Sequence, residues 1–148
     1  MKPILVSIEL TNYCQKGCSF CYSKSTPEGQ TFWTPDVLVS FIKDLAANGI
    51  EAVSFGGGEP LQYPHLWDLL DQLKEVPIFK SMTTNGLQLT PETARKLSGV
   101  LNKVHVSVHY PERSNEVPRA IQNVLALSEA GLKSGINFTT CKAPHLML

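Results

Sequence analysis

Three of the chain's four cysteines lie close together in the stretch CQKGCSFCY, and they are the residues best suited to chemistry. Cys14, Cys18 and Cys21 have the spacing C-x3-C-x2-C, which lets one compact loop turn three thiols toward a common point. Thiolates are soft ligands that suit zinc or an iron–sulfur cluster. Structural zinc normally takes four protein ligands, whereas the fourth cysteine here, Cys141, lies far along the chain. Three thiolates on a four-iron cluster would leave one iron open to another ligand.

The elements that must position this loop alternate between strand and helix patterns. Strands are predicted over 3–10, 50–55, 77–84, 104–110 and 134–141, and helices over 34–49, 65–73, 90–99 and 116–131. This alternation predicts parallel strands joined by right-handed crossovers, in either a doubly wound sheet or part of a barrel. In both folds, ligands gather at the carboxyl ends of the strands. The cysteine cluster and the stretches GGGEP, TTNG and SVHYP all fall there.

Helix starts and apolar stripes add detail to this prediction. Thr34 and Thr90 each precede a proline, so they are predicted to cap the first and third helices. The apolar faces predicted for the first two helices are Leu38, Phe41, Ile42 and Leu45, and Leu66, Leu69, Leu70 and Leu73.

The last two strands alternate in polarity. Val104, Val106 and Val108 alternate with His105, Ser107 and His109, so an apolar face toward the helices and a polar face toward a ligand-containing interior are predicted. The fifth strand divides in the same way, with Ile136, Phe138 and Thr140 on one face and Asn137, Thr139 and Cys141 on the other.

The composition excludes several classes of protein. A length of 148 residues favours a single domain, and a hydrophobic content of 43% is ordinary for a globular chain. Thirteen basic and thirteen acidic residues cancel, so no bulk charge recruits nucleic acid or an anionic membrane. The first apolar run is too short to span a membrane, and no targeting segment is evident. The cysteine pattern indicates a reducing compartment, so we predict a cytoplasmic protein.

The cysteine spacing after the first strand, joined to GGGEP after the second, resembles the radical S-adenosylmethionine (radical SAM) enzymes over about residues 4–141. The resemblance implies an incomplete (βα) barrel, with a [4Fe-4S] cluster bound by Cys14, Cys18 and Cys21 and SAM on the open iron. It implies reductive cleavage of SAM to a 5′-deoxyadenosyl radical, which acts on an unidentified substrate. It also implies oxygen sensitivity and an electron donor such as flavodoxin or ferredoxin.

The resemblance also assigns SAM-pocket residues, each with a simpler alternative. Phe20 would lie near the adenine, and Gly57, Gly58 and Glu59 would handle the methionyl amino group; the alternatives are loop packing and an ordinary glycine-rich turn. Asn85 is a pocket candidate, although an Asn-Gly pair is usually a turn. Ser107 matches the serine of a common Ser-x-Asp pattern, while His109 stands where aspartate is usual and is more often simply structural.

We interpret residues 1–148 as one radical SAM core domain, with four βα units and a fifth strand but no sixth unit. The open edge after the fifth strand leaves three explanations: a fragment, a naturally minimal family member, or cover by a second copy or a partner chain. Cys141 is interpreted as a small buried residue rather than a cluster ligand. Two alternatives remain open: a non-catalytic, truncated cluster- and SAM-binding module that acts with a partner protein, and a zinc-stabilised α/β domain.

Overall fold

The computed structural model describes residues 4–139. Its elements in chain order are β1 (Leu5–Glu9), α1 (Pro35–Ala47), β2 (Ala52–Gly56), the short 3₁₀ helix η1 (Pro60–Gln62), α2 (Leu66–Gln72), β3 (Phe79–Thr84), α3 (Pro91–Ser98), β4 (Lys103–Val108), α4 (Glu116–Glu129) and β5 (Lys133–Phe138). Every predicted helix and strand is present, with ends that differ by a few residues. Only η1 was not predicted.

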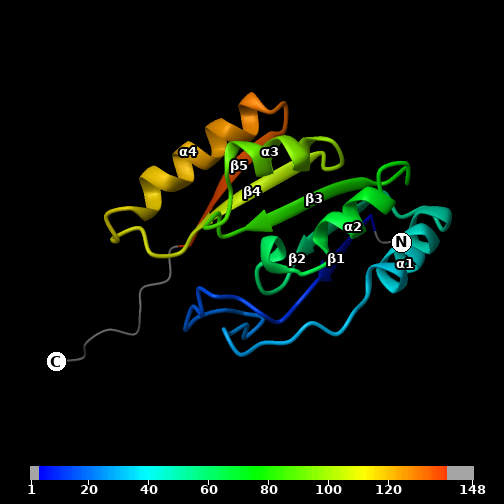
Figure 1. Cartoon of the computed structure of the whole chain (residues 1–148), viewed down its shortest axis with the longest axis horizontal. Helices are drawn as coiled ribbons and strands as arrows, with labels where there is room; N and C mark the ends of the chain where they lie inside the picture. Colours follow the sequence, from blue (N-terminus) through cyan, green and yellow to red (C-terminus); the bar gives the residue numbers. More distant parts are fainter. Residues whose placement is uncertain (1–3, 140–148) are drawn as a thin grey trace.

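The five strands form one parallel sheet in the order β1-β2-β3-β4-β5 (Figure 1). A doubly wound sheet reverses its strand order at a switch point, whereas a βα barrel adds each strand beside the previous one. The sequential order therefore decides between the two arrangements that the sequence allowed, and it confirms the incomplete barrel. Within residues 4–139, β1 and β5 each pair with one strand only.

The two faces of the sheet differ in chemistry, because successive side chains of a strand point to opposite sides. On the helix-covered face, the strand side chains Val53, Phe55, Met82, Val104 and Val106 are fully or almost fully buried. The opposite face carries small and polar side chains, which include Ser54, Ser81, Thr83, His105 and Ser107. The polarity pattern predicted for the fourth strand is thus confirmed.

The predicted apolar stripe is confirmed for α2 and only partly for α1. Leu66, Leu69, Leu70 and Leu73 are all buried. In α1, Leu38 and Ile42 are buried, but Phe41 is 46% exposed, so the prediction was wrong for this residue. Phe41 lies beside Trp33 in a groove against β1. Because β1 is an edge strand, nothing in the described part of the chain lies beyond this groove to cover the ring.

The two predicted threonine caps also differ. The Thr90 hydroxyl accepts a hydrogen bond from the Thr93 backbone N–H at 3.1 Å, as expected for a cap. Thr34 occupies the equivalent position before α1 with an extended backbone, but its side chain makes no capping bond. The expected side-chain cap at Thr34 was therefore wrong, although Pro35 begins the helix as predicted.

β5 is the less covered edge of the sheet. Ile136 and Phe138 lie in register with Val106 and Val108, so they share the helix-side face as predicted. They are nevertheless 40% and 55% exposed, whereas their partners on β4 are buried. Thr140 and Cys141 lie outside the described residues. Within residues 4–139, no helix is both long and apolar enough to cross a membrane.

Candidate functional site

The three cysteines lie in the long connection between β1 and α1, which extends away from the sheet in Figure 1 (blue to cyan). All three thiols are free and half-buried. The loop is closed by backbone hydrogen bonds from Cys14 N–H to Thr26 O at 3.0 Å and from Cys21 N–H to Cys18 O at 3.1 Å. These bonds fold the loop back on itself, so its thiols face one cavity of about 360 Å³.

The thiols of the loop differ in their tendency to ionise. Burial raises the pKa of Cys18, and a hydrogen bond with Tyr110 and the charge of Lys16 only partly oppose this effect. Burial also raises the pKa of Cys21, but hydrogen bonds with Ser23 and Ser25 outweigh it and lower the pKa overall. Cys21 is thus better prepared than Cys18 to act as a thiolate before any ligand binds.

The glycine turn after β2 lies against the cysteine loop. Gly57 and Gly58 have φ values of +68° and +61°, a left-handed conformation that favours glycine. A Cβ on Gly57 would lie 2.2 Å from the Cβ of Glu9, and one on Gly58 would lie 2.3 Å from the Tyr13 carbonyl oxygen. The turn can approach the end of β1 this closely only because both residues lack side chains.

Glu59 connects this turn to the end of β3. Its side chain is 2% exposed, and one carboxylate oxygen accepts from the Leu61 N–H at 3.0 Å and the Thr84 hydroxyl at 2.5 Å. The other oxygen accepts from the Asn85 N–H at 2.8 Å. Burial raises the pKa of Glu59, and these hydrogen bonds oppose it only in part. The carboxylate therefore has a structural role, whereas its contact with a SAM amino group stays a prediction.

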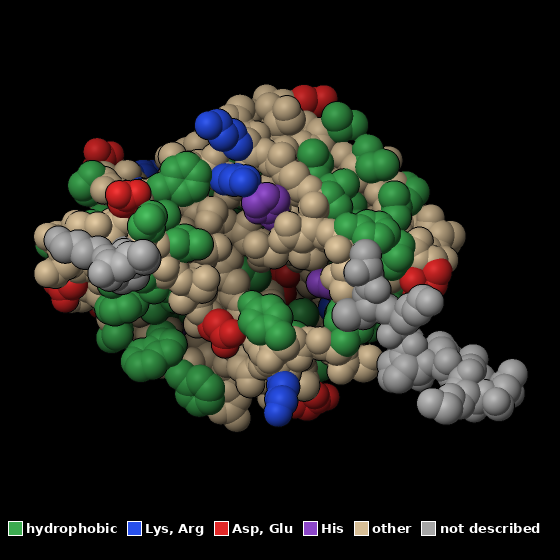
Figure 2. Space-filling model, turned by 180° about the vertical axis from the view of Figure 1, so that it is seen from behind, with side chains coloured by type: hydrophobic (Ala, Val, Ile, Leu, Met, Phe, Trp, Pro, Cys, Tyr) green, Lys and Arg blue, Asp and Glu red, His purple; other side chains and the backbone are tan. Residues whose placement is uncertain are grey.

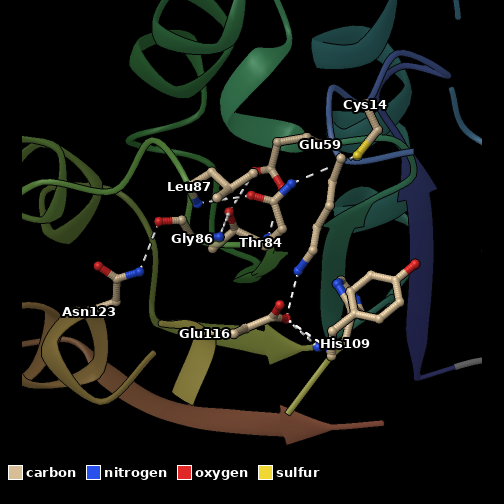
Figure 3. Close-up of polar contacts among 11 residues, drawn as sticks. Cys14, Glu59, Thr84, Gly86, Leu87, His109, Glu116 and Asn123 are labelled. Atoms are coloured by element: carbon tan, nitrogen blue, oxygen red, sulfur yellow. Dashed lines mark hydrogen bonds and ion pairs between the residues drawn. The ribbon is translucent and has the colours of Figure 1, made fainter. Parts of the chain in front are cut away.

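Asn85 links the end of β3 to the cysteine loop, between the labelled residues Thr84 and Gly86 of Figure 3. Its side-chain oxygen accepts from the Leu87 N–H at 2.9 Å, which makes the turn expected of an Asn-Gly pair. Its side-chain nitrogen lies 3.8 Å from the Cys14 sulfur. From α4, the Asn123 amide donates to the Gly86 carbonyl at 2.9 Å and fixes the same turn from its other side.

The end of β4 forms the opposite wall of the cavity. Ser107 is buried, and the His109 ring lies 5.9 Å from the ring of Phe20, centroid to centroid. Burial lowers the pKa of His109, the charge of Lys16 lowers it further, and Glu116 opposes both. The buried Nδ1 of His109 has no hydrogen-bond partner within residues 4–139. A neutral imidazole thus lines the cavity, and its unpartnered Nδ1 is buried.

The cavity brings together all the site residues predicted from the sequence. Its lining includes Cys14, Cys18, Phe20, Cys21, Gly57, Gly58, Glu59, Asn85, Ser107 and His109. Asn137 of β5 and Thr139, just after this strand, also line it, as the predicted alternation requires. Seen from behind, the molecule is hollowed near its centre, and basic side chains on this face are scattered rather than gathered (Figure 2).

Sequence reasoning missed two groups that shape the site. Ser23 and Ser25 bond to each other at 2.8 Å, and Ser25 accepts from the Gly58 N–H at 2.9 Å, so they join the cysteine loop to the glycine turn. Lys16 and Glu116 form an ion pair at 2.7 Å. Ser23 and Ser25, which follow Cys21 within four residues, were a visible signal for the first group. The second joins residues 100 positions apart, and no local pattern predicts it.

The arrangement of the thiols bears on which metal centre they could hold. Tetrahedral zinc requires its ligands to converge at about 2.3 Å from one ion. Among residues 4–139, no three His, Cys, Asp or Glu side chains are placed to hold a single metal ion. In a cluster, by contrast, each thiolate binds a different iron and the thiolates stand further apart. The three thiols nevertheless line one cavity, and soft thiolates suit either zinc or an iron–sulfur cluster.

The strands of the parallel sheet follow one another in chain order, and the thiols and polar groups lie at their carboxyl ends. These features define a partial (βα) barrel with its functional site at the carboxyl ends of the strands. The model of the Radical SAM superfamily matches residues 8–141. The chain therefore belongs to the radical SAM superfamily.

Curated relatives are longer than this chain. The mycofactocin maturase MftC of Mycobacterium tuberculosis is 28% identical over 149 aligned residues, which cover 93% of this chain and 38% of the relative. The probable GTP 3′,8-cyclase of Sulfurisphaera tokodaii is 30% identical over 146 residues, which cover 91% of this chain and 46% of the relative. Both relatives carry enzyme names. The chain spans less than half the length of either.

Solved structures share the fold. One is a crystal structure of Streptococcus suis SuiB bound to S-adenosylmethionine. It superposes with a TM-score of 0.80 at 23% identity, and the match covers 95% of this chain and 35% of SuiB. BtrN in complex with AdoMet and 2-DOIA gives a TM-score of 0.70 at 20% identity, over 93% of this chain and 58% of BtrN. At these identities the likeness shows the fold alone.

Proposed function

We propose that this chain binds a [4Fe-4S] cluster through Cys14, Cys18 and Cys21, binds SAM beside it, and cleaves SAM reductively to start radical chemistry on an unidentified substrate. Bound there, such a cluster would supply the single electron for reductive cleavage of the SAM C–S bond to methionine and a 5′-deoxyadenosyl radical. Abstraction of hydrogen then leaves 5′-deoxyadenosine and a substrate radical. The electron comes from a one-electron donor such as reduced flavodoxin or ferredoxin.

One observation carries the proposal: three free thiols from a single loop line the same cavity as the turn at Gly57, the Asn85 side chain and the polar end of β4. The thiols are the soft donors that a cluster needs. The cavity volume of about 360 Å³ lies within the range of small-molecule sites. The side chains of Ser107 and His109 add polar groups to the lining of the same cavity.

The chain's own residues have defined tasks in this proposal. The glycine turn brings backbone carbonyls to the cavity wall, where they can accept from the amino group of SAM. Phe20, 36% exposed and adjacent to Cys21, offers an apolar ring to the adenine. Ser107 in β4 and His109 just after it face the ribose, and their polar side chains orient the ligand while the sheet limits access of water.

The relatives support the ligand more than the substrate. The fold neighbours SuiB and BtrN were both solved with S-adenosylmethionine. SuiB was also solved with its precursor peptide SuiA, whereas the archaeal relative is named for GTP. These names point to different substrate classes, so we leave the substrate of this chain open.

The test begins with anaerobic reconstitution with iron and sulfide, reduction, and addition of SAM. We expect a brown protein with four irons per chain that releases 5′-deoxyadenosine. Cys18→Ala should abolish both the bound iron and the product, because a cluster with two protein thiolates is poorly held. The matched control is Cys141→Ala, which removes the cysteine outside the loop and should leave cluster content unchanged.

The outcomes separate the proposal from its rivals. A cluster that forms and binds SAM without releasing 5′-deoxyadenosine would identify a non-catalytic module and refute the catalytic claim. Stoichiometric zinc without acid-labile sulfide would instead identify a zinc-stabilised domain. Retention of full iron content by Cys18→Ala would refute the ligand assignment.

A further inference from the structure

A buried ion pair attaches the cysteine loop to the first turn of α4. Lys16, which lies between Cys14 and Cys18, places its Nζ 2.7 Å from Oε1 of Glu116. The two side chains are 7% and 5% exposed. The other ion pairs of the described residues lie on the surface, with side chains at least half exposed. The Lys16–Glu116 pair is therefore a distinct feature of the interior, located at the site.

Glu116 is held in place independently of Lys16. Its Oε1 also accepts from the backbone N–H groups of His109 at 2.5 Å and Tyr110 at 3.2 Å (Figure 3). The carboxylate thereby closes the turn between β4 and α4, and its charge lies at the positive end of the helix dipole. Glu116 is thus a preformed acceptor that the incoming lysine of the cysteine loop can reach.

The loop contacts the same turn at a second point. The Phe20 ring packs on the rings of His109 and Tyr110, with centroid distances of 5.9 and 5.3 Å. Lys16 itself lies 5.7 Å from the centre of the Tyr110 ring. The ion pair and the aromatic contact flank Cys18 on either side in sequence. The orientation of Cys18 therefore depends on how the loop is seated on this turn.

The charge of Lys16 acts on the site as well as on Glu116. The buried ammonium of Lys16, in the loop between Cys14 and Cys18, favours negative charge nearby, and its effect is balanced while the carboxylate stays beside it. Net charge and hydrogen bonding around a cluster set its reduction potential. Loss of either partner would leave one unbalanced charge beside the site, and the sign of that charge depends on which partner is removed.

We propose that Glu116 is a positioning residue: through Lys16 it seats the cysteine loop on the β4–α4 turn and balances the lysine charge beside the three thiolates. The inference rests on the proposed function insofar as it concerns a bound cluster. The seating of the loop itself is a property of the protein without any cofactor, so the two ideas can fail separately.

The first test measures seating in the cofactor-free protein by hydrogen exchange. Glu116→Gln and Lys16→Met should each speed exchange of the Cys21 amide, which bonds to Cys18 in the closed loop, by at least about tenfold. The matched controls are Glu112→Gln and Lys24→Met, which remove exposed charges from the same turn and the same loop and should leave the rate unchanged. Unchanged exchange in both ion-pair variants would overturn the proposal.

The second test measures the reduction potential of the reconstituted cluster. Glu116→Gln leaves an unpaired cation and should raise the potential, whereas Lys16→Met leaves an unpaired anion and should lower it. The double variant restores neutrality and should return toward the wild-type value. Shifts in the same direction, or no shifts, would mean that the pair only supports the fold, and would overturn the electrostatic part of the proposal.

Two provisions keep the tests decisive. If Lys16→Met fails to fold by circular dichroism, Lys16→Arg takes its place, since arginine keeps the charge and should retain both slow exchange and the wild-type potential. If the wild-type protein assembles no cluster, the proposed function fails while the exchange experiment still decides whether the loop is seated by Glu116.

Discussion

Two buried glutamates lie at the site, and they differ in the groups that bond to their carboxylates. Glu59 follows β2 and is bonded only to neutral donors, the Thr84 hydroxyl and two backbone N–H groups. Glu116 follows β4 and is bonded to two backbone N–H groups and to Lys16. Burial raises the pKa of both carboxyls, but only at Glu116 do its partners, Lys16 foremost, lower the pKa overall.

The difference shows what decides the protonation state of a buried carboxyl group. Both side chains are nearly inaccessible to solvent, at 2% and 5%, but Glu59 lies deeper among protein atoms, so depth and partners both contribute to the difference. Neutral hydrogen bonds only partly offset the loss of water around a charge, whereas a direct ion pair offsets much more of it. Glu59 therefore connects neighbouring strand ends, while Glu116 also anchors a segment that lies far away in the sequence.

The largest effect expected from this comparison is the loss of the charged anchor. Glu116→Ala leaves Lys16 buried without its partner and two N–H groups without an acceptor, so the free energy of unfolding should fall by about 3–5 kcal/mol. Urea unfolding of the cofactor-free protein, followed by circular dichroism, measures this loss. Glu112→Ala, at an exposed position of the same turn, should change it by no more than about 0.5 kcal/mol. A loss below about 1 kcal/mol for Glu116→Ala would contradict the comparison.

A smaller effect is expected at the neutral anchor. Glu59→Gln keeps the shape but replaces one accepting oxygen with an NH₂ group that faces a donor, so we expect a loss of about 1–3 kcal/mol. The same unfolding experiment applies, with the exposed Glu51→Gln as the control. A loss as large as that of Glu116→Ala would show that Glu59 also carries a charged interaction, and would remove the contrast between the two sites.

Much of the fold and of the site could be predicted from the sequence, because the signals were local. Apolar runs and alternating polarity predicted the strands, and apolar residues at helical spacing predicted the helices between them. Glycine-rich or cysteine-rich stretches marked the strand ends. Since parallel strands bring their carboxyl ends to one edge, residues as distant as Cys14, Asn85 and His109 were expected in one place. The structure places all of them around one cavity.

The remainder depended on contacts that have no local pattern. Phe41 fits the apolar stripe of α1, yet it is exposed because β1 is an edge strand within residues 4–139. Thr34 fits a cap by its position and type, yet its side chain makes no such bond. Lys16 resembles an ordinary surface lysine of a polar loop. Its partner Glu116 lies 100 residues away and becomes visible only when the β4–α4 turn folds beside the loop.

The smallest expected effect is a difference in pH dependence. Glutamate in an unfolded chain has a pKa of about 4.3. Because the folded pKa of Glu116 is lower, its stabilisation is present above about pH 4.3 and is lost as the pH falls through the folded pKa. Because the folded pKa of Glu59 is raised, its contribution is fully present below about pH 4.3 and is lost as the pH rises through the folded pKa.

The stability deficits of the two Gln variants should therefore change with pH in opposite directions. The stability deficit of Glu116→Gln should shrink on acidification, since the wild type then loses what the variant already lacks. The deficit of Glu59→Gln should instead shrink as the pH rises above about 4.3, because the wild type must then ionise a buried acid that makes no direct ion pair. Unfolding curves between about pH 3 and about pH 7 test this, and parallel curves would mean that Lys16 does not distinguish the two acids.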